Sequence, residues 1–319
     1  MSALTPTALV AELDRYIVNQ RDAKRALALA LRNRERRRRI EPALGTLSQP
    51  PHVLLSGPSG VGKTTLALRA AELVNAPLIR VDVAWLQERD GVGRGVQRIV
   101  SDLIEIVLRR SDESADVTAA IAQVEELGIV LLDDIDRLAP RDQGEHLDTS
   151  GEVVQRALIP VLDGAEVVTR FGPLRTEHLL FIATGAFTTI RTSDLTPELL
   201  GRFPVRAELT SLDVEDFEHI LSAPERSLRD HYVALLAADG IAVEFEQAAL
   251  SEIARVAAEL NAHGEDLGAR RLVHVLERVL EDLSFAEPAP SDVCRIDIGY
   301  VLNAVGDLAE EQDLGQFIL

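Results

Sequence analysis

Short apolar runs separated by stretches with helical periodicity fill the first two thirds of the chain. The runs that predict strands are His52–Leu55, Leu78–Val83, Gly128–Leu132, Leu179–Thr184 and Val205–Leu209. Continuous aliphatic runs are typical of parallel strands buried on both faces. Strands that alternate with helices indicate crossover connections. The pattern therefore predicts an α/β domain, with a parallel sheet flanked by helices.

The pattern changes after Ser211. Apolar residues then recur at helical spacing, and two short strand candidates, Ile241–Phe245 and Val293–Ile298, lie among them. The predicted helices are Val214–Leu221, Ser227–Ala238, Gln247–Leu260 and Ala269–Leu283. We expect a nucleotide-binding domain over residues 1–212 and a smaller, mostly helical domain over residues 213–319.

Two helices are predicted ahead of the sheet. Thr5 and Pro6 suit the N-cap and first position of a helix that runs to about Tyr16. The second, Arg21–Arg39, ends in a basic cluster of Arg32, Arg34 and residues 36–39. That cluster is either a solvated helix end or a contact with an acidic neighbouring subunit.

Composition narrows the classes of function. The chain has 319 residues and a formal net charge of −19, which argues against a nucleic-acid surface. Its lone cysteine, Cys294, excludes an intrachain disulfide and a cysteine-based zinc site, and suits a reducing compartment. We find no apolar run of membrane-spanning length and no signal-peptide pattern. We therefore expect a cytoplasmic protein with no membrane and no nucleic-acid partner.

The segment Gly57–Thr64 fits the phosphate-binding pattern G-x-x-x-x-G-K-[ST] at every fixed position. An apolar strand precedes it and an Ala- and Leu-rich helix follows, which is the context this motif requires. Glycines let successive backbone N–H groups turn toward phosphate oxygens, and the helix N-terminus adds positive charge. Lys63 would reach the terminal phosphates, and the Thr64 hydroxyl would ligate Mg²⁺. The expected cofactors are therefore ATP or ADP with Mg²⁺.

Acidic residues follow the strand Gly128–Leu132. In open α/β sheets, ligands bind beyond the carboxyl ends of the strands. We expect Asp133 to hold the magnesium ion through water, and Asp134 to position or deprotonate the water that attacks the nucleotide.

These motifs, together with a helical second domain, are similar to those of AAA+ ATPases. In detail the chain resembles the HslU (ClpY) family, the ATPase and unfoldase subunits of the bacterial HslUV protease. The matching pieces run from end to end. Besides the phosphate loop they include residues 22–26, 30–34, 75–77, 180–183, 185–187, 197–199, 201–202 and 268–272, and the terminal residues 317–319.

The resemblance implies roles for individual residues. Thr184 matches the first sensor, Arg202 the arginine finger given to a neighbouring subunit, and Arg270 the second sensor, a role that adjacent Arg271 could share. The remaining nucleotide contacts it implies are Ile17 and Val18 at the adenine, Gly60, Val61, Gly62, Lys63, Thr64 and Thr65 at the phosphates, and Glu198 near the intersubunit site.

The resemblance also implies partners. Phe317, Ile318 and Leu319 match the tail that docks on the peptidase, and Gly91, Val92 and Gly93 match the pore loop. It therefore implies a homo-hexameric ring, an HslV-type peptidase and protein substrates.

The chain departs from the family pattern in four places. Only about residues 109–123 remain of a long intermediate domain, and we expect there a short loop and one turn of helix. Asp134 replaces a glutamate, so its carboxylate falls roughly 1 to 1.5 Å short, a displacement that can cost about 100-fold in rate. Gly91 stands where the pore loop has a tyrosine that grips the substrate, and Asn19 replaces a glycine beside the adenine segment.

From the sequence we expect an ATPase without peptidase activity of its own, which activates an HslV-type peptidase and feeds substrates to it, with protein unfolding impaired. Two alternatives stay open. One is an ATP-sensing gate or scaffold with slow hydrolysis, and the other is an AAA+ remodelling ATPase unconnected with proteolysis.

Overall fold

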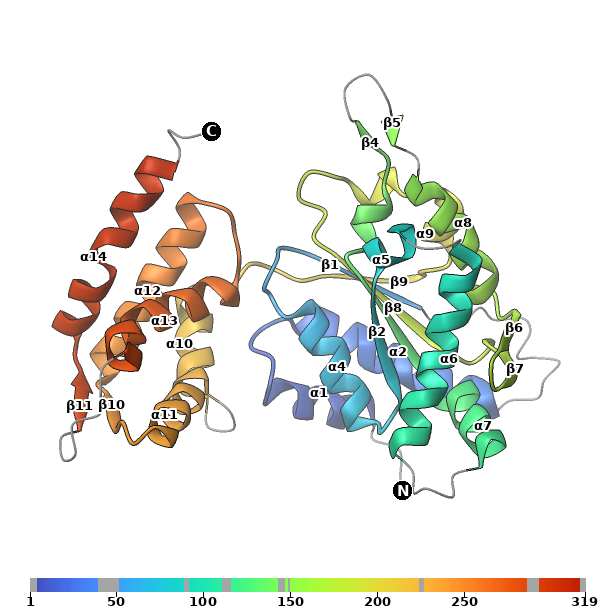
Figure 1. Cartoon of the computed structure of the whole chain (residues 1–319), viewed down its shortest axis with the longest axis horizontal. Coiled ribbons are helices and arrows are strands. Elements are labelled where there is room, and N and C mark those ends of the chain that lie inside the picture. Colours follow the sequence, from blue (N-terminus) through green and yellow to red (C-terminus); the bar gives the residue numbers. More distant parts are fainter. Residues whose placement is uncertain are drawn as a thin grey trace. The chain divides into compact units, whose positions relative to one another are not determined.

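The computed structural model describes residues 5–39, 52–88, 92–110, 116–142, 147–148, 150–223, 227–285 and 293–315. The chain separates into two compact units (Figure 1). The first comprises Met1–Leu13, Gln20–Gly57 and Lys63–Leu209. The second comprises Asp14–Asn19, Pro58–Gly62 and Thr210–Leu319, so it includes the middle of the phosphate loop.

A five-stranded parallel sheet forms the centre of the first unit. Its strand order is β2-β3-β8-β1-β9. The strands are β1 (Val53–Ser56), β2 (Leu78–Asp82), β3 (Ile129–Asp133), β8 (Leu180–Gly185) and β9 (Val205–Glu208). Each lies within one residue of its predicted bounds, and the expected α/β class is confirmed.

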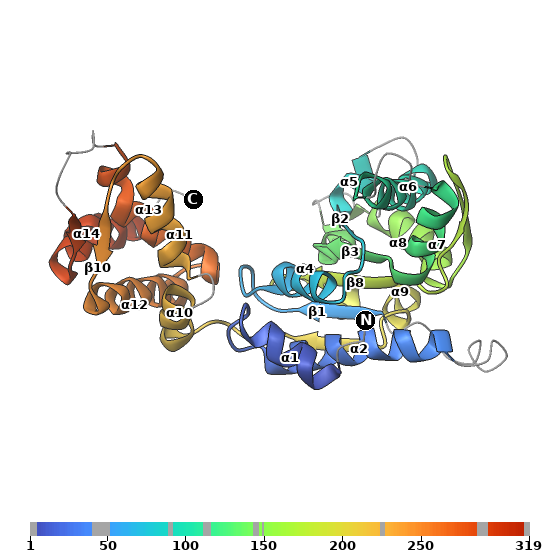
Figure 2. The same ribbon diagram turned by 90° about the horizontal axis from the view of Figure 1, so that it is seen from below.

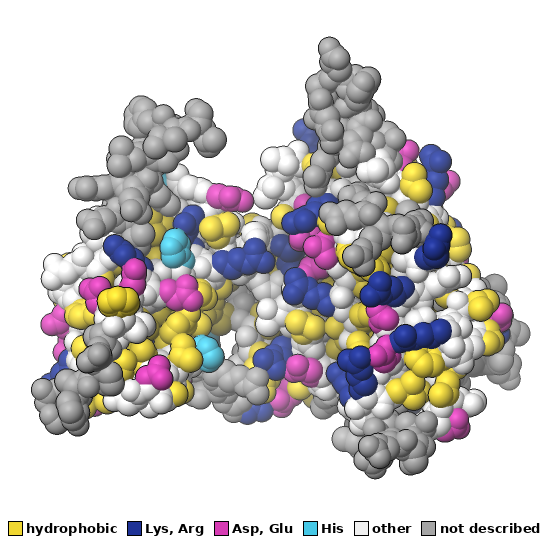
Figure 3. Space-filling view, viewed as in Figure 1, with side chains coloured by type: hydrophobic (Ala, Val, Ile, Leu, Met, Phe, Trp, Pro, Cys, Tyr) yellow, Lys and Arg dark blue, Asp and Glu magenta, His cyan; other side chains and the backbone are white. Residues whose placement is uncertain are grey.

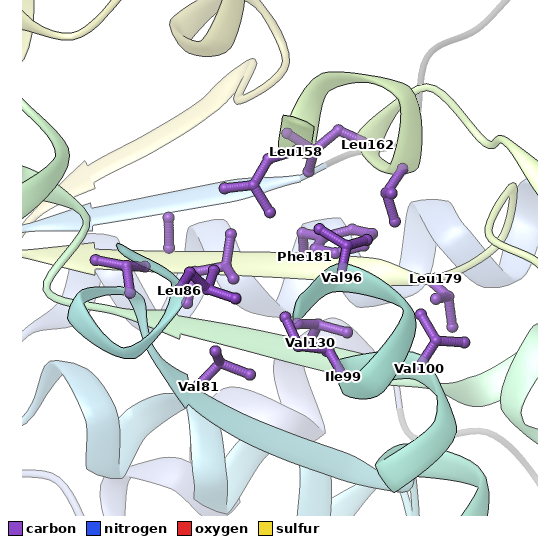
Figure 4. Packing of buried hydrophobic residues seen from close by; sticks show 14 of the residues in the cluster. Val81, Leu86, Val96, Ile99, Val100, Val130, Leu158, Leu162, Leu179 and Phe181 are labelled. Carbon is purple, nitrogen blue, oxygen red and sulfur yellow. The ribbon is translucent and has the colours of Figure 1, made fainter. Parts of the chain in front are cut away.

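Both faces of the central strands β1, β3 and β8 are buried. Because side chains alternate along a strand, Val130 and Phe181 point to one face, where α6 (Val92–Arg110) and α8 (Ser150–Leu162) cover them (Figure 4). Figure 2 shows α2 (Arg21–Arg39) on the opposite face, where α4 (Lys63–Leu73) also packs. The carboxyl ends of the strands therefore form a rigid edge on which polar residues can be held.

Smaller elements complete the first unit. The helices are α1 (Pro6–Asp14), α5 (Val83–Glu88), α7 (Val117–Leu127) and α9 (Pro197–Gly201), with the 3₁₀ turns η1 (Ile135–Leu138) and η2 (Thr192–Asp194). The paired strands are β4 (Arg141–Asp142) with β5 (Leu147–Asp148), and β6 (Glu166–Thr169) with β7 (Gly172–Arg175).

The short segment over residues 109–123 is more helical than expected. Helix α6 continues to Arg110, and α7 begins at Val117 and runs for 11 residues. The Asp116 side chain caps α7 by accepting a hydrogen bond from the backbone N–H of Thr118 at 2.9 Å. The expectation of a single helical turn was wrong because a good N-cap and the buried Ala120 and Val124 stabilise the longer helix.

The basic cluster that ends α2 is largely paired inside the chain. Arg34 is buried and donates to the carbonyl oxygens of Leu127 and Gly128 at 3.1 and 3.0 Å. Burial, with a smaller contribution from nearby Arg38, lowers the pKa of Arg34 to about 10. Arg38 pairs with Glu126 at 2.5 Å. These contacts hold α2 against the end of α7 and the start of β3.

The second unit is mostly helical. Its helices are α10 (Val214–Ser222), α11 (Leu228–Ala238), α12 (Gln247–His263), α13 (Ala269–Phe285) and α14 (Ile298–Gly315), and β10 (Val243–Phe245) pairs in parallel with β11 (Cys294–Ile296). Leu250, Leu276 and Val301 are buried where α12, α13 and α14 pack together. The sequence did not predict α14. Among the described residues, no helix is long and apolar enough to cross a membrane.

Candidate functional site

The phosphate loop curls where β1 passes into α4. Gly57 and Gly62 have φ values of +134° and +101°, which other residues rarely adopt. A Cβ on Gly57 would also lie 2.2 Å from the carbonyl oxygen of Leu209. Lys63 is 8% exposed, and its Nζ donates to the carbonyl oxygen of Gly57 at 2.6 Å. The lysine is therefore folded back across its own loop.

Asp133, the last residue of β3, is the centre of a polar cluster in the first unit. Its Oδ1 accepts hydrogen bonds from the hydroxyls of Thr64, at 3.0 Å, and Thr184. Its Oδ2 accepts two from Arg80, from Nε at 2.7 Å and Nη2 at 2.6 Å. The structure thus brings together Thr64, Asp133 and Thr184, which the sequence selected from three separate segments.

Asp134 has a left-handed backbone, with φ +58° and ψ +46°. Asp tolerates this region better than most residues with a side chain. The half-buried carboxylate lies 3.2 Å from Nη2 of Arg137. Desolvation and the neighbouring charge of Asp133 raise the pKa of Asp134, and Arg137 opposes the shift. The side chain is therefore placed beside the Asp133 cluster and biased toward accepting a proton.

The oxygen atoms at this edge suit a magnesium ion. Mg²⁺ prefers hard oxygen ligands and usually keeps several waters while binding one or two carboxylates and substrate phosphates. The Thr64 hydroxyl and the Asp133 carboxylate supply such oxygens within 3.0 Å of each other. Over the described ranges, no group of three or more His, Cys, Asp or Glu forms a self-sufficient metal cage. The donor set fits a metal shared with a phosphate ligand.

In the second unit, a turn before α13 packs on the middle of the phosphate loop. The backbone N–H of Ala269 donates to the carbonyl oxygen of Gly60 at 3.0 Å. Gly268 has φ +53°, and a Cβ there would lie 2.6 Å from the carbonyl carbon of Gly60. Arg270 Nη1 donates to the Ser59 hydroxyl at 3.1 Å. Arg270 therefore lies at the loop, and its role as the second sensor stays a prediction.

The same turn is held by side chains that sequence reasoning did not select. Asn261 donates to the carbonyl oxygen of Gly268 and accepts from the N–H of Leu267, both at 3.2 Å. Arg271 donates from Nη2 to the carbonyl oxygen of Glu265 at 3.3 Å. Arg271 thus supports the turn, whereas Arg270 points to the loop.

The segment expected at the adenine also belongs to the second unit. Ile17 is buried, and a Cβ on Gly62 would lie 3.9 Å from Ile17 Cγ2, so the side chain lies beside the loop. Val18 is partly buried. Asn19 has φ +56° and donates from Nδ2 to Asp216 Oδ2 at 3.2 Å. A glycine is thus not required at Asn19, because asparagine tolerates the left-handed region.

Arg202 does not join the Asp133 cluster. It is the C-cap residue of α9, and its Nε and Nη2 both bond to the carboxylate of Asp163, Nη2 at 2.8 Å. This pairing, and more weakly Glu198, raises the pKa of Arg202. Glu198 lies exposed in the first turn of α9. Arg202, which the resemblance identifies as the arginine finger, is thus paired with an acidic residue of its own chain.

Of the other site residues expected from the sequence, the structure describes some and not others. Thr65 is exposed on α4, and Val61 is buried in the loop. Val92 and the exposed Gly93 belong to the first turn of α6. Gly91 and the terminal Phe317, Ile318 and Leu319 lie outside the described residues.

Sequence reasoning missed Arg80, Arg137 and Asp163. A signal for Arg80 was present, because it is the one basic residue inside the mostly apolar run Leu78–Val83. Its contact with Asp133 depends on β2 pairing with β3, in which Asp82 lies opposite Asp133. Asp163 and Arg137 carry no comparable signal.

Known proteins resemble this chain over its whole length. Residues 49–206 match the model of the AAA domain family (Cdc48 subfamily). Over their full lengths, the chain is 36% identical to the "ATP-dependent protease ATPase subunit HslU" of Sinorhizobium fredii and 34% identical to that of a Chelativorans species. The corresponding subunit of Rhodopseudomonas palustris is 36% identical, again with full coverage of both chains.

These alignments also show that this chain is shorter than its relatives. The first runs over 434 positions, whereas the chain has 319 residues, so at least 115 positions (434 minus 319) face a gap in this chain.

Proposed function

Because the chain belongs to the HslU family of ATP-dependent protease ATPase subunits, we propose that it forms an ATP-driven homo-hexameric ring that activates an HslV-type peptidase and feeds protein substrates to it. The observation that carries the nucleotide part is the contact of Thr64 with Asp133, which puts a loop hydroxyl and a strand-end carboxylate 3.0 Å apart. The cytoplasmic setting expected from the sequence stays a prediction.

The residues of the loop would bind and orient the nucleotide. Lys63 would exchange the carbonyl oxygen of Gly57 for phosphate oxygens, and the backbone N–H groups of residues 60–65 would supply further donors. Thr64 and Asp133 would hold Mg²⁺, which when bound neutralises charge on the phosphates. Within the second unit, Arg270 donates to the hydroxyl of Ser59, a residue of the loop, and would act there as the second sensor.

The hydrolytic step would use three further side chains. Asp134 would accept a proton from the attacking water or orient it, and its raised pKa favours proton uptake. Thr184 would support this edge through its bond to Asp133. Arg202 would have to leave Asp163 to reach the phosphate of a neighbouring subunit, which is why a ring is part of the proposal.

Replacing Lys63 tests the nucleotide site. Lys63→Ala should weaken ATP affinity by about 2 to 3 kcal/mol, the scale of a lost charge-assisted contact. Isothermal titration calorimetry on the full chain is the measurement. Arg69→Ala, on the same helix but in an exposed pair with Glu72, is the matched control and should bind ATP normally. Unchanged affinity in Lys63→Ala would remove the phosphate-loop assignment.

A second candidate is an ATP-sensing gate with slow turnover. Its support is Asp134, whose short side chain is paired with Arg137 and whose left-handed backbone suits aspartate. Measured ATP turnover, with and without the peptidase, separates the two. Turnover that rises with peptidase and substrate favours the motor, whereas tight ATP binding with negligible turnover favours the gate.

A further inference from the structure

The carboxylate of Asp133 has its acceptor capacity filled by side chains of its own chain. A carboxylate offers about four lone-pair positions. Thr64 and Thr184 donate to Oδ1, and Arg80 donates twice to Oδ2, at 2.7 and 2.6 Å. The Thr64 hydroxyl also lies 3.3 Å from Oδ2, a longer contact than its 3.0 Å bond to Oδ1. A metal ion, or a water bound to it, can use Oδ2 only if Arg80 gives up that position.

Arg80 is the partner best able to leave. The Asp133 side chain is 7% exposed, while that of Arg80 is 58% exposed. Thr64 lies on α4, which packs against the sheet, and Thr184 lies on β8, next to β3 within the sheet, so their hydroxyls are fixed near Oδ1. The arginine reaches over from the edge strand β2 on a long side chain and can return to water at little cost.

We propose that Arg80 is a displaceable counter-cation on Asp133, which magnesium-bound nucleotide replaces, and that Arg80 thereby sets how strongly nucleotide binding depends on Mg²⁺. This inference rests on the proposed nucleotide site. Arg80 acts through Asp133 and is a positioning residue.

The charge of Arg80 should affect nucleotide binding in opposite directions with and without Mg²⁺. Without Mg²⁺, Arg80 cancels the Asp133 charge, which would otherwise repel the phosphates across a partly desolvated site. With Mg²⁺ present, the ion itself cancels that charge, so the same arginine competes for Oδ2. Removing Arg80 should therefore weaken metal-free nucleotide binding and strengthen the contribution of the metal.

A purely structural role predicts something else. If Arg80 only holds β2 against β3, its loss would disturb the loop equally in both states, and the two affinities would change by the same factor. The ratio of the metal-free Kd to the Kd with Mg²⁺ distinguishes these possibilities.

The experiment is calorimetric titration of ADP into the full chain, once with EDTA and once with excess MgCl₂. In Arg80→Gln the ratio of the two Kd values should rise at least about fivefold, the scale of a partly exposed charge-assisted contact. Arg156→Gln removes the same charge from an exposed pair with Glu152 on α8 and should leave the ratio unchanged. Arg80→Lys keeps the charge and should stay within about twofold of the unmodified chain.

A second measurement needs no loss of Arg80. In the unmodified chain, the side-chain Nε–H resonance of Arg80, assigned by comparison with Arg80→Lys, should move on adding Mg²⁺ to the ADP complex. The expected new position is that of exposed arginines such as Arg156.

An unchanged Kd ratio in Arg80→Gln, a ratio for Arg80→Lys as large as that for Arg80→Gln, or a stationary resonance would overturn the inference. Failure of the proposed site looks different, since ADP would then fail to bind in either buffer or would bind without depending on Lys63.

Discussion

Asp134 has a left-handed backbone conformation, which aspartate adopts more readily than most residues with a side chain. At φ +58°, a longer side chain loses the local stabilisation that makes left-handed Asp and Asn common. The Asp134 backbone is therefore unstrained, but the side chain is short for positioning the attacking water. Slow turnover would follow because the carboxylate does not reach far enough, whereas the backbone conformation would oppose a change to glutamate only weakly.

Exchanging Asp134 for glutamate tests whether reach limits hydrolysis. Asp134→Glu should raise kcat for ATP with little change in KM, because the interaction gained belongs to the transition state. Asp134→Asn is the matched control, since it keeps the left-handed preference and size but removes the base, and it should lower kcat. Steady-state ATP hydrolysis at saturating Mg²⁺ is the measurement. If Asp134→Asn turns over like the unmodified chain, Asp134 is not the water-positioning group.

At the scale of elements, α8 connects the two parts of the first unit that carry proposed catalytic residues. Buried Gln155 donates to the carbonyl oxygen of Leu138 in η1 and accepts from the N–H of Thr196 ahead of α9, both at 2.8 Å. The residue that follows α8, Asp163, holds Arg202. The turn that follows Asp134 and the start of α9 are therefore both hydrogen-bonded to one side chain of α8.

His52 joins three elements at the other edge of the sheet. It precedes β1, its Nε2 donates to the carbonyl oxygen of Leu162 on α8 at 3.0 Å, and its Nδ1 accepts from the N–H of Phe181 on β8 at 3.2 Å. Burial lowers the pKa of His52 to about 4, against an ordinary value of 6.5, although the bond to Leu162 opposes the shift. The neutral ring is therefore the native form.

The lowered pKa of His52 predicts that the folded chain loses stability in acid. A depressed pKa in the folded state contributes stability above about pH 6.5 that is lost as the pH falls toward 4, on the order of 3 kcal/mol in all. Urea unfolding between pH 7.5 and 5 is the measurement. The stability gap between the unmodified chain and His52→Gln should narrow as the pH falls, while exposed His263→Gln should track the unmodified chain. A gap independent of pH would contradict the prediction.

The strands and the loop were predictable from sequence because each depends on local signals. Aliphatic runs locate β1, β3 and β8 to within one residue, and the glycine spacing locates the phosphate loop. The contacts of Arg80 with Asp133 and of Arg202 with Asp163 were not predictable, because they join residues 53 and 39 positions apart. Helix α7 was underestimated, since part of its stability comes from the burial of Ala120 and Val124, which the local pattern does not reveal.

For the whole molecule, charge is unevenly distributed. Acidic residues outnumber basic ones several-fold in residues 210–319, whereas the preceding part is nearly balanced. On the face drawn in Figure 3, Lys and Arg side chains are accordingly spread over the first unit. A partner that docks on the second unit should therefore present cations. The tail, residues 316–319, adds the apolar residues Phe317, Ile318 and Leu319, which would suit an apolar groove.

Peptidase activation tests the proposed function most directly. An HslV-type peptidase is mixed with this chain in ATP, and cleavage of a small fluorogenic peptide is followed. We predict strong stimulation by the full chain and none by a chain that lacks residues 316–319, because burial of the three apolar side chains, worth roughly 1.5 to 3 kcal/mol each in transfer terms, would be lost. Lys63→Ala should also fail to stimulate, while the truncated chain should still bind ATP. No stimulation by the full chain, or equal stimulation by the truncated chain, would contradict the proposed function.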